Sequence, residues 1–147
     1  MRVWAALLLL AFLVPGCGPK QAPAKDYWDE EARLQMFQGA VQGLQETSKK
    51  KGEFAVPSEG AKRSNFTFNM QISIGSAQVF LDHHAKSENA EKIRGMMKEL
   101  RDIEATNPTG PDQQLTAKLK DLTDRALALK MRPMTKEEEN SIQKSIK

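Results

Sequence analysis

Two places in this chain carry side chains able to do chemistry. Cys17 is the only cysteine, and His83 and His84 are the only histidines. A lone cysteine cannot form a disulfide within its own chain, so its thiol is left for covalent modification or nucleophilic attack. Nucleophilic catalysis also needs a base and an orienting group, and no Gly-x-Ser-x-Gly or comparable pattern supplies them. The sequence therefore predicts no enzyme active site.

The histidine pair is a candidate metal site. Imidazole nitrogens bind zinc and copper, and the thioethers of Met96 and Met97 would suit copper. Adjacent residues on a helix diverge by about 100°, however, so neighbouring histidines rarely hold one ion together. We keep a periplasmic metal or small-ligand carrier that uses His83 and His84 as an alternative function. The main interpretation expects no cofactor.

The first residues have the pattern of an export signal. Arg2 gives a positive start, Val3 to Val14 form an uncharged apolar run, and Pro15 and Gly16 break it just before Cys17. The run is too short to cross about 30 Å of hydrocarbon as a helix. A plain signal peptide cut after Ala24 is an alternative, and it would leave Cys17 without a role.

The string Val14-Pro15-Gly16-Cys17 resembles the lipobox of bacterial lipoproteins. The resemblance implies a diacylglyceryl group on the Cys17 thiol, cleavage before Cys17, and a further fatty acid such as palmitate on the new amine. Two or three acyl chains would hold the protein firmly, because each buried CH₂ contributes about 0.8 kcal/mol. In the best-studied lipoprotein sorting systems, a residue other than aspartate after the cysteine, here Gly18, favours the outer membrane, with the protein facing the periplasm.

Three parts follow from this interpretation: a signal peptide at residues 1–16, a lipidated tether at 17–25, and a domain at 26–147. The tether has two prolines and no apolar pattern, as flexible linkers do. The full chain has a net charge of +3 and 28% charged residues, with basic and acidic side chains interleaved. An exported chain of this kind is not expected to bind nucleic acid.

Apolar residues at helical spacing predict helices over residues 26–51, 88–106 and 112–131. A short terminal helix over 135–147 opens with a capping box, in which Thr135 and Glu138 satisfy each other's backbone groups. It has a weak apolar stripe and could dock on the body or on a partner. Residues 52–64 contain two glycines and a proline and predict a loop.

Residues 65–87 are ambiguous. Phe66, Phe68, Met70, Ile72 and Ile74 alternate with polar residues, which is a strand pattern, but the segment also fits a helical face. A single strand would leave its backbone groups unpaired, and no second strand-like run exists in the sequence. We therefore favour a helix, and its apolar residues on several sides predict that it is the most buried one.

The sequence thus predicts an all-α fold, a small bundle of four to five helices after a cleaved signal peptide and a flexible tether. The predicted function is that of a membrane-anchored envelope lipoprotein, a non-enzymatic binding, assembly or scaffolding module. Its partners would be the membrane, through lipid on Cys17, and an envelope protein.

Overall fold

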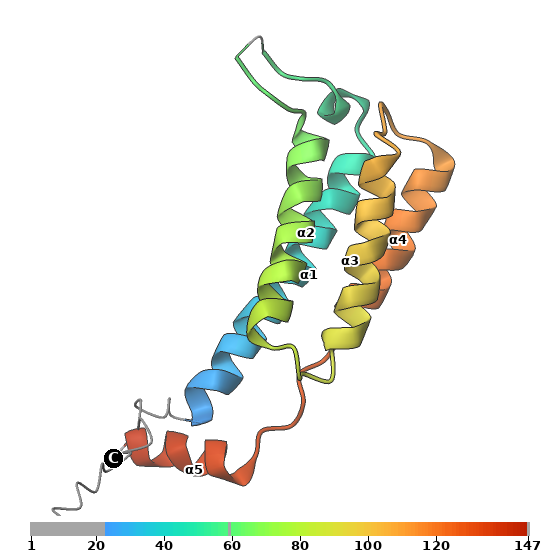
Figure 1. The fold of residues 1–147 in the computed structure, drawn as a ribbon. Helices are drawn as coiled ribbons and strands as arrows, with labels where there is room; N and C mark the ends of the chain where they lie inside the picture. The colour runs from blue at the N-terminus through green and yellow to red at the C-terminus, as the bar shows by residue number, and fades with distance from the viewer. Residues whose placement is uncertain (1–22, 59, 147) are drawn as a thin grey trace, which may run out of the picture.

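The computed structural model describes residues 23–58 and 60–146, and this part of the chain is all-α (Figure 1). Four long helices, α1 to α4, run side by side, and a shorter α5 lies across the N-terminal end of α1 (Figure 1). The predicted all-α bundle is confirmed. The predicted signal peptide, Cys17 and most of the predicted tether lie outside the described residues. Within the described ranges, no helix is both long enough and apolar enough to span a bilayer.

Helix α1 (Pro23–Ser48) is the longest and packs against α2, α4 and α5. It begins three residues before the predicted start, with proline in its first turn, where the missing N–H costs nothing. Its predicted apolar stripe is buried in the core, and it consists of Leu34, Phe37, Val41 and Leu44. A turn of 3₁₀ helix, η1 (Lys51–Phe54), then begins the predicted loop, and the Phe54 ring stacks on Phe66 at 4.3 Å.

Helix α2 (Asn65–His83) settles the ambiguous segment as a helix. The Ser64 side chain caps it by accepting a hydrogen bond from the Thr67 N–H at 3.2 Å. One face is buried against α1 and α3, and it consists of Phe66, Met70, Ser73, Ala77, Phe80 and Leu81. The prediction that α2 is the most buried helix is wrong, because Phe68 and Ile72 are each 45% exposed and Val79 is 39% exposed. Two apolar faces exist on this helix, and the bundle covers one.

Helices α3 (Ala90–Ala105) and α4 (Gln113–Leu127) complete the bundle. Their predicted stripes are buried, with Ile93 and Leu100 on α3 and Leu119 and Leu122 on α4 fully enclosed. The predicted break between them is confirmed. The chain turns there at Asn107, whose φ of 48° lies in the left-handed region that asparagine tolerates better than most residues.

Helix α5 (Lys136–Ser145) has the predicted capping box: the Thr135 side chain accepts from the Glu138 N–H, and Glu138 accepts from the Thr135 N–H. The helix docks on the body, where it contacts α1. It lies at the same end of the bundle as the start of α1 and the α2–α3 connection, opposite η1 and the α3–α4 connection (Figure 1).

Candidate functional site

The structure places the two histidines in different surroundings. His84 ends α2 and is buried, with its Nε2 3.0 Å from Oδ2 of Asp29, whereas His83 is exposed. Met96 and Met97 are buried in the core. Across residues 23–58 and 60–146, no group of three or more His, Cys, Asp or Glu side chains is arranged to hold a metal ion. The geometry gives the metal-carrier alternative no support, and it stays an untested prediction.

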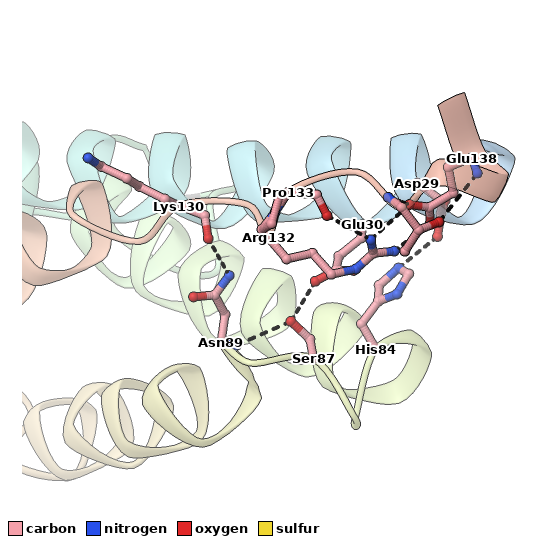
Figure 2. Close-up of polar contacts among 10 residues, drawn as sticks. Asp29, Glu30, His84, Ser87, Asn89, Lys130, Arg132, Pro133 and Glu138 are labelled. Carbon is pink, nitrogen blue, oxygen red and sulfur yellow. Dashed lines mark hydrogen bonds and ion pairs between the residues drawn. The ribbon is translucent and has the colours of Figure 1, made fainter. Parts of the chain in front are cut away.

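His84 belongs to a cluster of polar side chains at the end of the bundle where α1 begins (Figure 2). Asp29 accepts a hydrogen bond from Nε of Arg33 at 2.7 Å, and this contact with a cation holds the pKa of Asp29 below its ordinary value of 3.8. The Asp29 carboxylate can only accept, so Nε2 of His84 carries the proton that it donates. The imidazole thereby joins the end of α2 to the first turns of α1.

Glu30, which is buried on α1, extends the cluster to the α2–α3 connection. The Ser87 hydroxyl donates to Oε1 of Glu30 at 2.5 Å and accepts from the Asn89 N–H at 3.2 Å. The Asn89 amide then donates to the Lys130 carbonyl at 3.0 Å (Figure 2). The Ser87 side chain thus joins the α2–α3 connection to α1.

Arg132 lies at the centre of the cluster. Its guanidinium donates two hydrogen bonds to the Glu138 carboxylate, at 2.9 and 2.6 Å, and lies 3.8 Å from Oε2 of Glu30 and 5.3 Å from the centre of the Tyr27 ring. The paired geometry and the neighbouring cation lower the pKa of Glu138 from 4.5 to about 2. Burial of Glu138 is therefore matched by a fixed positive charge.

We call Asp29, Glu30, His84, Ser87, Arg132 and Glu138 the polar cluster. Every one of these side chains is held by another group of the chain, and no buried side-chain nitrogen or oxygen in the described residues lacks a hydrogen-bond partner. Sequence reasoning missed the cluster, because Asp29 and Glu30 read as ordinary acids at a helix start. Its hydrogen bonds and ion pairs fix α5 and the α2–α3 connection to α1.

A hollow of about 850 Å³ lies between the ends of α3 and α4, beneath their connection. Ile103 and Leu115 form its floor with acidic side chains around them. Three of these carboxylates have partners: Glu99 and Asp121 bind Arg125, and Asp112 caps α4 by accepting from the Leu115 N–H at 2.8 Å. Asp102 and Lys118 also line the hollow.

The opposite side of the bundle carries exposed apolar residues. A groove of about 300 Å³ between α1 and α2 is lined almost entirely by apolar atoms, and its lining includes Met36, Ile72, Gly75 and Val79. Met36 is 62% exposed, and Phe68 continues the row one turn before Ile72 on α2. We call Met36, Phe68, Ile72, Gly75 and Val79 the α1–α2 face.

The helices that form this face carry little charge around it. Arg33, which also lines the groove, is paired with Asp29. Residues 34–45 of α1 and 64–81, which span most of α2, contain no Asp, Glu, Lys or Arg. Gly39, Gly43 and Gly75 are exposed, and an added Cβ at each would meet nothing within 4 Å. No helix in the described part of the chain packs closely on Gly39 or Gly43.

Comparisons with known proteins give no family for the chain: no family model, curated protein or solved structure matches it.

Proposed function

We propose that the protein is a lipid-anchored envelope protein whose helical domain is a non-enzymatic binding and assembly module. The observation that carries this proposal is the α1–α2 face, a largely apolar and exposed surface on a helical bundle. Soluble helices normally present charged residues to water, and an exposed apolar groove more often marks a protein contact. The lipobox-like string Val14-Pro15-Gly16-Cys17 supports the membrane anchor.

The polar cluster supports the same proposal, because it lies where the predicted tether would join α1. It braces the start of α1, where the segment from Cys17 would join the domain, against α5 and the α2–α3 connection. This bracing would keep the first turns of α1 packed on the bundle at the point where the predicted flexible tether joins the domain. An outer-membrane position facing the periplasm is part of the proposal, through Gly18 after the cysteine.

Intact mass of the membrane-extracted protein tests the anchor. We expect a chain that begins at Cys17 and is heavier by two or three acyl chains. A Cys17→Ser variant should lose both this mass and its membrane association. An unacylated wild-type chain that begins near Lys25 would refute the lipid anchor.

Affinity capture from solubilised envelopes tests the binding face. The bait is the full chain, compared with an Ile72→Glu variant and with Leu127→Glu as the matched control. Leu127 lies on α4 and is 48% exposed, close to Ile72 at 45%. We expect Ile72→Glu alone to lose whatever protein the wild type retains, a second copy of the chain included. Equal recovery by all three baits would refute a binding role for this face.

A further inference from the structure

We propose that the α1–α2 face binds a second copy of this chain, with the two α2 helices antiparallel across a two-fold axis. This inference rests on the proposed function, in which the α1–α2 face binds a protein, and it specifies that protein as a second copy of the chain. It stands on four observations: the spacing of the exposed residues, the pairing of large with small, the charges at the ends of the row, and the lack of charge between them.

The spacing is that of a helix–helix seam. Phe68, Ile72, Gly75 and Val79 follow one another at intervals of four, three and four residues along α2, the rhythm by which one helix packs against another. The row spans about 16 Å at 1.5 Å per residue. The buried residues of α2 already serve the internal core, so the exposed row is a second seam that no helix in the described residues covers.

An antiparallel two-fold centred between Ile72 and Gly75 pairs these residues with complementary sizes. Ile72 of each copy then faces Gly75 of the other, a large side chain against a site with no side chain. Space for this contact exists, because a Cβ added at Gly75 would meet nothing within 4 Å. Phe68 of each copy faces Val79 of the other, so the row is complementary to itself, as a two-fold interface requires.

The charges that border the row also favour the antiparallel arrangement. Arg63 lies before the row, with its guanidinium 5.3 Å from the Phe68 ring centre, and Asp82 follows the row at the other end. An antiparallel pair brings Arg63 of one copy near Asp82 of the other. A parallel pair would place arginine beside arginine and aspartate beside aspartate, which is repulsive.

Between these ends, Gln71 lies beside the groove, and its side-chain oxygen accepts a hydrogen bond from the Arg63 guanidinium of its own chain. A lipid surface fits less well, because helices that lie on membranes carry many Lys and Arg residues, and α2 has none from Asn65 through Leu81. Membrane tethering would also raise the effective concentration of copies, so a small face suffices.

Cysteine crosslinking in membranes of expressing cells tests the arrangement in the full chain. Ile72→Cys and Gly75→Cys place thiols near the axis, and a short bismaleimide should join two copies of either variant into a dimer of twice the chain mass. The parent chain, with Cys17 alone, sets the background. Leu127→Cys on α4 is the matched exposed control, and it should give at least tenfold less dimer.

A second pair of variants tests the direction. Two copies of Phe68→Cys would lie about 16 Å apart along the helices in the antiparallel dimer, so this variant alone should crosslink poorly. Coexpression with a differently tagged Val79→Cys chain should restore a mixed dimer. Efficient Phe68–Phe68 crosslinking would overturn the antiparallel arrangement.

The remaining outcomes separate this inference from the proposed function. No dimer above background at either position 72 or 75, or equal dimer at position 127, would overturn self-association. An adduct at position 72 with a different protein would also overturn it, while supporting the binding role of the face. Lipid adducts in place of protein would overturn both.

Discussion

The polar cluster and the α1–α2 face depart in opposite ways from the usual division of apolar inside and polar outside. In the cluster, carboxylates such as Glu30 and Glu138 are buried, each 4% exposed, but they are matched by Arg132 and by hydroxyl and backbone donors. On the face, Phe68, Ile72 and Val79 are exposed. The Arg63 guanidinium lies over the Phe68 ring, but no helix in the described residues covers the three side chains. Buried charges that have partners within the chain stabilise the fold. Exposed apolar side chains that no other part of the chain covers leave a surface on which another molecule can bind.

This difference predicts that changes in the cluster and changes on the face act on separate properties. Cluster variants should alter the free energy of unfolding and leave crosslinking at position 75 intact. Face variants should alter crosslinking and leave the stability of the bundle intact.

The largest expected effect is on stability, from Arg132→Ala. Removing this cation leaves Glu138 and Glu30 without their positive partner, and we expect a loss of about 3 kcal/mol or undocking of α5. Urea unfolding followed by circular dichroism measures the loss of unfolding free energy, and hydrogen exchange of the α5 amides measures undocking of that helix. Arg125→Ala is the matched control, since Arg125 pairs with Glu99 and Asp121 on the exposed side. It should cost less than about 1 kcal/mol, and equal losses would contradict the assignment.

The next effect is on the pH dependence of stability. The pKa of Glu138 is about 2 in the folded protein, against an ordinary 4.5. Above 4.5 the carboxylate is ionised in both states and its pairing stabilises the fold fully. As the pH falls from 4.5 towards 2, the unfolded chain takes up the proton first, so this stabilisation is lost over that window.

We expect the loss from Glu138 to be about 2 kcal/mol, the usual contribution of hydrogen bonds to a charged group. Urea midpoints measured across the acidic range check it. Glu138→Gln should be less stable at neutral pH and should show a shallower acid dependence than wild type. A residual slope is expected, because Arg33 also lowers the pKa of Asp29. Wild type and Glu138→Gln with the same acid slope would disprove the role of this carboxylate.

On the face, Ile72→Lys should reduce the Gly75→Cys crosslinked dimer by about tenfold, equivalent to about 1.4 kcal/mol. In the dimer, the new positive charge would be buried against Gly75 of the other copy and close to the same charge at position 72 of that copy. Because position 72 is exposed in the single chain, unfolding free energy should stay within about 0.5 kcal/mol. Leu127→Lys should change neither property. A large loss of stability in Ile72→Lys would mean that Ile72 serves the core.

The smallest effect combines both properties in one variant. Gly75→Ala should stabilise the bundle by about 0.5–1 kcal/mol, because glycine is a poor helix former and the added methyl meets no neighbour. The same methyl should reduce the mixed dimer of Phe68→Cys with Val79→Cys a few-fold, since it fills the position that faces Ile72. Gly95→Ala on α3 is the matched control: Gly95 is also exposed and open. It should give the stability gain without the crosslinking loss.

The sequence was sufficient to predict those features that depend on residues close together in the chain. The stripe at Leu115, Leu119 and Leu122 and the capping box of Thr135 with Glu138 were confirmed, because both are set by residues within a few positions. Helix over strand for residues 65–83 was also confirmed, on the argument that a lone strand cannot pair its backbone.

The polar cluster and the exposed face could not be predicted in the same way. Asp29 and His84 meet across 55 positions, and nothing local marks either as the partner of the other. Phe68 and Met70 look alike in sequence, and only the placement of α1 and α3 decides that Met70 is buried and Phe68 is not. The signal that pointed to the face was present in the apolar residues on several sides of α2, although we interpreted it as deeper burial.

The position of the polar cluster has a mechanical consequence. A pull on the segment that precedes α1 enters the bundle at its first turns, beside Asp29 and Glu30. His84, Ser87 and Arg132 join those turns to α2, to the α2–α3 connection and to the segment before α5. The load is thereby shared among several contacts that must break together, in shear, instead of peeling α1 away one turn at a time.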